Sequence, residues 1–100
     1  MGRYERVKPR YLPAKLLQIR KSLGLSQNGI IKRLGLEDEI SQSRISGYEL
    51  GTREPSLPTL LKYARCAGLC VDYLIDDELQ LPKRLPAKSS HLVRLKSVKR

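Results

Sequence analysis

The chain has 100 residues, a formal net charge of +10, two cysteines and 40% hydrophobic residues. This length predicts one small domain and argues against a large enzyme cleft, and no apolar run approaches the ~20 residues of a membrane span. Two cysteines do not make a disulfide framework, and the N-terminal residues lack the apolar stretch of a secretory signal, so we expect a cytoplasmic protein. The positive excess favours a polyanionic partner, nucleic acid before membrane.

The basic excess lies in the two flanks of the chain. Residues 1–12 carry a net charge of +3 and residues 79–100 a net charge of +7, whereas residues 13–78 are neutral. We therefore predict a basic N-terminal arm (1–12), a compact domain (13–78) and a basic C-terminal tail (79–100), with both flanks poorly ordered when free. For the tail, a role in solubility alone is the alternative that the charge pattern leaves open.

The neutral middle has the pattern of short helices separated by glycines. Apolar residues at helical spacing predict five helices, which begin in chain order at Pro13, after Ser26, after Ser41, after Ser56 and at about Val71. Glycine follows each of the first four, at positions 24, 35, 51 and 68, and a glycine there can adopt the left-handed conformation that ends a helix. No segment alternates as a strand does, so the prediction is an all-α fold with a helix-turn-helix.

Several motifs within these helices resemble one known family. The stretch Leu23-Gly24-Leu25-Ser26-Gln27, the pair Leu34-Gly35 and the run Ile45-Ser46-Gly47-Tyr48-Glu49-Leu50-Gly51-Thr52-Arg53-Glu54-Pro55-Ser56-Leu57 are similar to the Cro/cI-type (XRE) helix-turn-helix family. The likeness continues into Asp72-Tyr73-Leu74 and covers about residues 13–76. It implies a five-helix Cro/cI-repressor-like domain that is not an enzyme, needs no cofactor, and acts as a transcriptional repressor bound to double-stranded DNA as a homodimer on an inverted repeat.

The sequence departs from the family pattern at two places. Leu36-Glu37-Asp38-Glu39 lengthens the turn before the third helix by about four residues, and Ile31 stands where relatives tend to have alanine. We expect the two changes to be linked, because a branched side chain pushes helices apart and a longer turn permits it. The three acidic residues should tilt away from DNA phosphates, since they would otherwise weaken binding.

The third predicted helix, about residues 41–50, carries the candidate base-reading groups. Its exposed side chains are short or planar hydrogen-bonding groups, and an α-helix fits the major groove of DNA, where glutamine pairs with adenine and arginine with guanine. The resemblance assigns base reading to Gln42, Ser43, Arg44, Ser46 and Gly47. We expect Gly47 to be exposed and to bring the backbone closer to the groove. An ordinary solvated helix face is the alternative.

The candidate phosphate contacts lie on either side of that helix. Gln27 opens the second helix, where amide groups suit an anion, and the resemblance assigns phosphate contact to Gln27, Asn28 and Arg53. Arg20 and Glu49 fall on inward faces, and buried charges must be paired. The resemblance implies a salt bridge between them that holds the reading helix at its angle. It also suggests a dimer surface near Leu69, Val71 and Tyr73, although the sequence does not define that surface.

The sequence offers little for catalysis or metal binding. Cys66 and Cys70 lack the paired spacing of a zinc site, and packing is their expected role. His91 is the single histidine and lies in the tail, so no metal site or catalytic triad is predicted. Acidic residues gather near the last helix, where a solvated helix end is favoured over a cation site; they are Asp72, Asp76, Asp77 and Glu78.

Two other function classes stay open. One is an antitoxin that binds a toxin protein and represses its own operon; co-purification of a small protein would distinguish it. The other is a non-specific polyanion binder whose affinity survives Gln42→Ala and Arg44→Ala but disappears without residues 79–100. The sequence leaves the operator, the regulated genes and any effector undefined.

Overall fold

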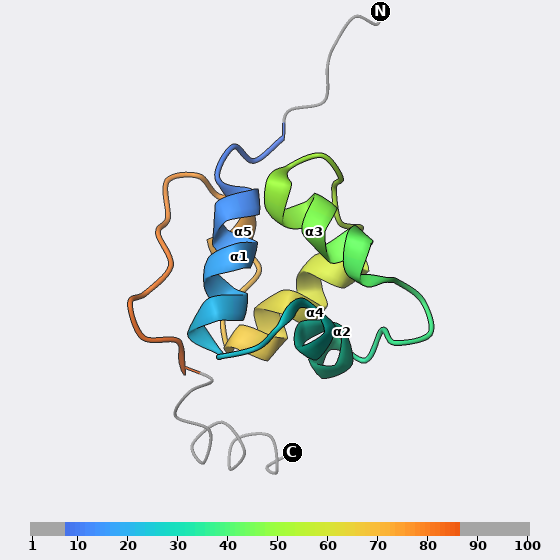
Figure 1. Cartoon of the computed structure of the whole chain (residues 1–100). Helices are drawn as coiled ribbons and strands as arrows, with labels where there is room; N and C mark the ends of the chain where they lie inside the picture. The colour runs from blue at the N-terminus through green and yellow to red at the C-terminus, as the bar shows by residue number, and fades with distance from the viewer. Residues whose placement is uncertain (1–7, 87–100) are drawn as a thin grey trace, which may run out of the picture.

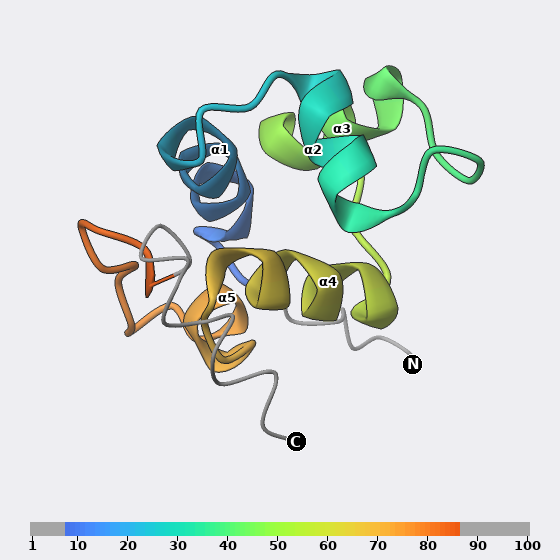
Figure 2. The same cartoon turned by 90° about the horizontal axis from the view of Figure 1, so that it is seen from below.

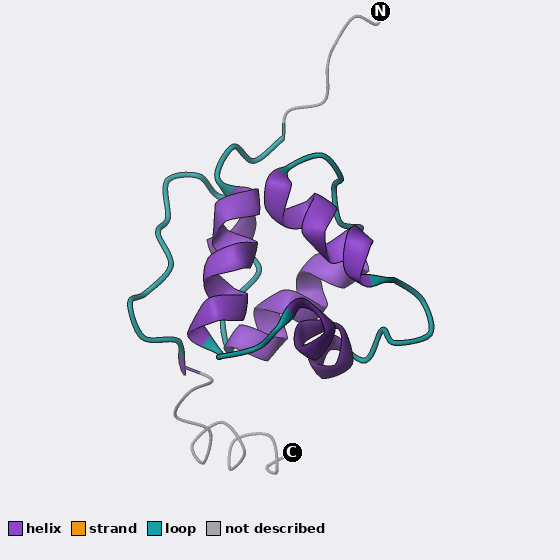
Figure 3. Ribbon diagram, in the orientation of Figure 1, coloured by secondary structure: helices purple, strands orange, loops and turns teal. Residues whose placement is uncertain are grey.

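The computed structural model describes residues 8–86, and within that range it contains five α-helices and no strand (Figure 3). The helices are α1 (Leu12–Ser22), α2 (Gln27–Leu34), α3 (Gln42–Leu50), α4 (Leu57–Ala67) and α5 (Asp72–Ile75) (Figure 1). The five predicted helices are confirmed, with α1 beginning one residue before Pro13 and α5 one residue after Val71. None of the helices in this range is long and apolar enough to cross a membrane.

Local sequence accounts for the ends of the middle helices. The Ser26 side chain accepts a hydrogen bond of 2.9 Å from the Gly29 amide at the start of α2, and Ser56 accepts one of 3.2 Å from the Thr59 amide at the start of α4. Such caps satisfy amides that the first turn of a helix leaves unpaired. At the other end of α3, Gly51 takes a left-handed φ of +83°, a conformation that side chains disfavour. The helix therefore stops there and the chain reverses.

The helices surround one apolar core. In the view of Figure 2, α4 crosses the lower half of the domain, with α1, α2 and α3 above it. The short α5 lies next to α4. Every helix contributes a fully buried side chain, and the largest are Tyr63, Leu16, Ile19, Ile30, Ile45, Leu74 and Leu85. Each buried leucine or isoleucine stabilises the fold by roughly 1.5–3 kcal/mol relative to an exposed one. This core holds α2 and α3 together and leaves one side of α3 in solvent.

The packed unit extends beyond the predicted boundary at residue 78. Leu81 and Leu85 belong to the same buried cluster as the helices, and Leu85 is fully buried. The charge pattern assigned these leucines to the basic tail because lysines, arginines and prolines surround them, but this part of the prediction is wrong, since both leucines are buried in the core. Residues 1–7 and 87–100, which hold most of the predicted arm and tail, lie outside the described residues.

The acidic insertion between α2 and α3 is anchored at its first residue. Leu36 is 3% exposed and joins the core, and its carbonyl accepts hydrogen bonds from the amides of Glu39 and Ile40. Glu37, Asp38 and Glu39 are exposed, on a loop that bulges from the helical body (Figure 3). The insertion is thus a compact turn with its charges in solvent. Its link to Ile31 stays a prediction.

A buried lysine ties α5 to α1. The Lys15 side chain is 6% exposed, and its Nζ donates hydrogen bonds to the carbonyl oxygens of Tyr73 at 2.7 Å and Asp76 at 2.9 Å. Carbonyls at the C-terminal end of a helix lack partners within the helix and favour a cation. Lys15 therefore helps to dock the short α5 against the domain, together with the fully buried Leu74.

Candidate nucleic-acid interface

An ion pair links α1 to the last turn of α3. Arg20 Nε lies 2.7 Å from Glu49 Oε2, and Arg20 Nη2 donates to Glu49 Oε1 at 3.0 Å. The two side chains are 14% and 6% exposed, respectively. Arg20 Nη1 also donates to the Leu25 carbonyl oxygen at 3.0 Å, and the hydrogen bonds to Glu49 raise the pKa of Arg20. The two parallel hydrogen bonds give α3 a defined orientation relative to α1 and the loop before α2.

Two glutamines extend this ion pair to the surface. Gln27 Nε2 donates to Glu49 Oε1 at 3.1 Å, and Gln42 Nε2 donates to Gln27 Oε1 at 3.0 Å. Gln27 is the first residue of α2 and Gln42 the first residue of α3. The hydrogen bonds therefore run from the half-buried Arg20 through Glu49 and Gln27 to an exposed residue of α3. The sequence analysis paired Arg20 with Glu49 and assigned Gln27 and Gln42 separate contacts with DNA, but it did not predict the contact between the glutamines.

The exposed start of α3 presents polar groups to solvent. Gln42, Ser43 and Arg44 are exposed and Ser46 is half-buried. Ser41 precedes the helix at the N-cap position but makes no capping bond, because its hydroxyl pairs with that of Ser43 at 2.9 Å. Gln42 has one amide hydrogen engaged by Gln27. The other amide hydrogen and the carbonyl oxygen remain as a donor–acceptor pair.

The prediction that Gly47 lies exposed on this face is wrong. Gly47 is buried, and a Cβ added to it would lie 2.9 Å from Cγ, 3.1 Å from Cβ and 3.2 Å from Cδ of Arg53. The aliphatic part of Arg53 therefore fills the space beside Gly47. Gly47 does not present its backbone to solvent, because the Arg53 side chain lies beside it. The sequence could not show this, since Arg53 lies beyond the end of the helix.

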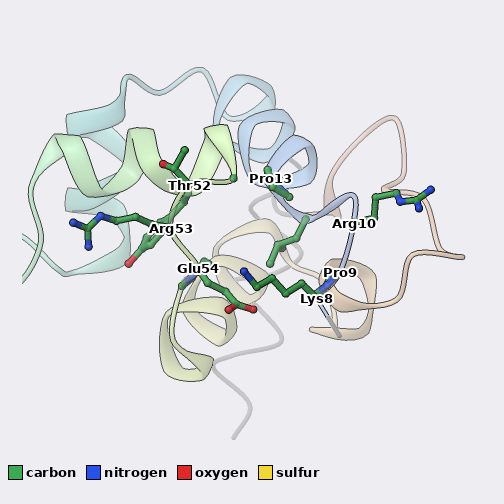
Figure 4. A pocket seen from close by; sticks show the side chains of 11 residues that line it. Lys8, Pro9, Arg10, Pro13, Thr52, Arg53 and Glu54 are labelled. Carbon is green, nitrogen blue, oxygen red and sulfur yellow. The ribbon is translucent and has the colours of Figure 1, made fainter. Parts of the chain in front are cut away.

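The described end of the N-terminal arm, from Lys8 onward, lies beside the end of α3. Lys8, Arg10 and Arg53 line a hollow of about 320 Å³ whose apolar side includes Pro13 and Tyr48 (Figure 4). Arg53 is exposed, and its side chain extends from the loop alongside α3 (Figure 4). The guanidinium groups of Arg10 and Arg53 point away from the hollow in opposite directions (Figure 4), so the stems of these side chains, and not their charges, line it.

One core residue near the ion pair was not predicted. Tyr63 in α4 is fully buried, and its hydroxyl has no hydrogen-bond partner among the described residues. Burial, together with the nearby Glu49 charge, raises the pKa of Tyr63 well above its ordinary value. Tyr63 therefore stays neutral and acts as packing beneath α3. A signal was present, because Tyr63 falls three residues after Leu60 and four before Ala67 on the apolar face of α4.

The remaining sequence candidates lie away from α3. Leu69, Val71 and Tyr73 are half-buried against the core rather than openly exposed. Cys66 is half-buried, Cys70 is exposed and both are free thiols; burial raises the pKa of the Cys66 thiol. Over residues 8–86, no group of three His, Cys, Asp or Glu side chains is placed to hold a metal ion.

Comparisons with known proteins bear on this arrangement. A helix-turn-helix family model matches residues 16–74. A similar solved structure is that of the P22 c2 repressor protein in complex with a synthetic operator, crystallised in the presence of Tl⁺. The two chains are 26% identical, the match covers 66% of this chain and 94% of that one, and the TM-score is 0.57. A search of curated proteins found no match.

The fold and the family match define a DNA-binding domain of the transcription-regulator class. Within that class, the chain belongs to the Cro/cI-type helix-turn-helix family, because the family match covers more than half of its residues and the fold agrees. The resemblance found in the sequence is thereby confirmed.

Proposed function

We propose that this protein is a sequence-specific repressor that binds double-stranded DNA as a homodimer, with α3 in the major groove. The observation that carries the proposal is the hydrogen-bonded series from Arg20 to Gln42, which orients an exposed amide at the start of α3. Adenine offers the N7 acceptor and the N6 donor in the major groove. The free donor and acceptor of Gln42 match these two groups. Gln42 is therefore proposed to read adenine.

Arg44 and the two serines complete the proposed reading surface. Arg44 is exposed, and its planar fork of donors suits the O6 and N7 acceptors of guanine. Ser43 and Ser46 can donate or accept a hydrogen bond, so they would tolerate more than one base. Each well-formed bidentate pair discriminates against the wrong base by about 1–3 kcal/mol. Two such contacts in each half-site would suffice for a preferred sequence.

Phosphate contacts would position α3 in the groove. Gln27 and Asn28 form the first turn of α2, where backbone amides lack helical partners and favour an anion. Lys8 lines the hollow at the opposite end of α3, and the basic flanks would add affinity that falls with salt. A protein that binds operator DNA must be located in the same compartment as the DNA, so the proposal includes a cytoplasmic location.

The similar P22 c2 repressor structure contains a synthetic operator, which supports a DNA target of defined sequence for this chain. If two copies of the chain bind symmetrically, the target is an inverted repeat. Helix-turn-helix dimers place half-sites about 34–36 Å apart. For the dimer surface we propose the exposed apolar side chains at the start of α4 and the end of α5. Leu57 is 79% exposed and Ile75 is 44% exposed, and both line a hollow of about 350 Å³ that also includes Pro9 and Pro55.

The test is selection from random duplex DNA at near-physiological salt. The full chain is compared with Gln42→Ala/Arg44→Ala and with Lys62→Ala, which removes one exposed charge from α4. An enriched inverted repeat that is lost only in the double variant supports the proposal. Salt-sensitive binding without an enriched sequence contradicts it and favours a polyanion binder. Specific binding together with a co-purified small protein would instead favour the antitoxin role.

A further inference from the structure

The loop after α3 is folded back onto the second turn of that helix. The amides of Thr52 and Arg53 both donate to the carbonyl oxygen of Gly47, at 3.0 and 3.2 Å. The left-handed backbone of Gly51 makes this reversal possible. Arg53 therefore starts immediately beside Gly47, at a place set by backbone hydrogen bonds.

Because Gly47 has no side chain, there is room for the methylene groups of Arg53 beside it. A Cβ at position 47 would lie under 3.0 Å from Arg53 Cγ and only 3.1 Å from its Cβ, and the Arg53 Cβ cannot move without the backbone. Arg53 is nevertheless exposed as a residue. Its methylene groups therefore cover α3 while the guanidinium stays in solvent, as long cationic side chains commonly do.

Position 47 belongs to the proposed reading face. It follows Ser43 by four residues and Arg44 by three, and residues at these spacings lie next to one another on a helix surface. A side chain that lies over Gly47 thus extends the row formed by Ser43 and Arg44. Arg53 takes a place on α3 that a residue of the helix itself would otherwise occupy.

We propose that Arg53 is a specificity-determining residue that reads a guanine from the loop, and that Gly47 is the positioning residue that makes room for it. The inference rests on the proposed function, because it assumes that α3 enters the major groove. It differs from the sequence prediction of a phosphate contact for Arg53. The Arg53 stem lies on α3 and leaves the guanidinium in solvent, where its fork of donors matches the paired acceptors of guanine. A phosphate contact would carry no sequence information.

The experiment repeats the selection and then measures affinity for every single-base-pair variant of the selected site. The proteins are the full wild-type chain, Arg53→Ala, Arg53→Lys, Gly47→Ala and Gly47→Ala/Arg53→Ala, with Lys62→Ala as the charge control. Thermal unfolding of each variant is measured alongside. Alanine is favoured over glycine within a helix, so a loss of specificity in Gly47→Ala without a lower melting temperature separates positioning from folding.

The expected result is one G·C position whose preference falls on the order of ten- to a hundredfold in both Arg53 variants. Gly47→Ala weakens the same position and has no additional effect once Arg53 is alanine, as expected for a coupled pair. A uniform loss in Arg53→Ala, with a salt slope smaller by about one and normal binding by Arg53→Lys, would make Arg53 a phosphate contact and overturn the inference. If wild type selects no sequence, the proposed function fails and this inference fails with it.

Discussion

The Arg20 guanidinium and the Glu49 carboxylate meet through two hydrogen bonds of 2.7 and 3.0 Å, and Gln27 binds the same Glu49 oxygen that accepts the longer one. Glu49 is therefore shared between the core and the surface. Its charge is neutralised by α1, while one of its oxygens orients the residue that in turn holds Gln42. The ion pair thus connects the packing of α1 to the presentation of α3.

Arg20→Met should destabilise the fold by about 3 kcal/mol, because it leaves the carboxylate of Glu49 buried without its cation. We expect a lower urea midpoint, with a smaller effect on the selected DNA sequence for the protein that remains folded. The matched variant Arg20→Met/Glu49→Leu should recover much of the lost stability, since it removes both charges. Equal stability of Arg20→Met and wild type would show that the ion pair does not hold α3.

Two truncations separate packing from charge at the C-terminal end. A chain that stops after residue 78 loses Leu81 and Leu85 from the core, at a cost of roughly 1.5–3 kcal/mol for each leucine. A chain that stops after residue 86 keeps both leucines and loses five basic residues. Calorimetry should show a large drop in melting temperature for the first truncation only. The second should bind DNA more weakly and with less salt dependence. Similar melting of the two truncated chains would place the domain boundary back at residue 78.

Asp77 makes the folding stability depend on pH in the acidic range. Its carboxylate accepts hydrogen bonds from the backbone amides of Arg10 at 2.9 Å and Tyr11 at 3.1 Å, and these bonds hold the pKa of Asp77 below its usual value. Because the folded pKa is the lower one, the contribution of Asp77 is present above the unfolded pKa of about 3.9 and is lost as the pH falls through the folded pKa. In that pH range, the melting temperature of Asp77→Asn should fall less with decreasing pH than that of the wild type. Asp38→Asn, an exposed carboxylate in the insertion, is the control and should not.

The proposed dimer surface can be tested without DNA. Leu57→Ser removes a side chain that is 79% exposed, so it should leave the monomer fold intact while weakening self-association. Leu50→Ser is the matched control, because Leu50 is 74% exposed but lies at the end of α3. Sedimentation velocity over a concentration series should show fewer dimers for Leu57→Ser alone. Equal dimerisation by both variants would move the dimer interface elsewhere on the domain.

The sequence predicted the helices and their order because local patterns determine them. Serine caps, terminal glycines and apolar residues at helical spacing all act within a few residues. The family motifs then indicated which helix would read DNA. Arg20 and Glu49 could be paired from the sequence because both are charges on inward faces, and such charges need a partner.

Other features depend on residues that are distant in sequence, and only the tertiary structure decided them. Leu81 and Leu85 show no helical periodicity in the sequence, yet both are buried in the core. Lys15 looks like an ordinary surface lysine until α5 brings two carbonyl oxygens to it. Gly47 has the spacing of an exposed reader, but the reversal at Gly51 lays Arg53 over it. Short-range preferences thus specify the helices of this protein, whereas the packing of those helices decides which side chains can reach DNA.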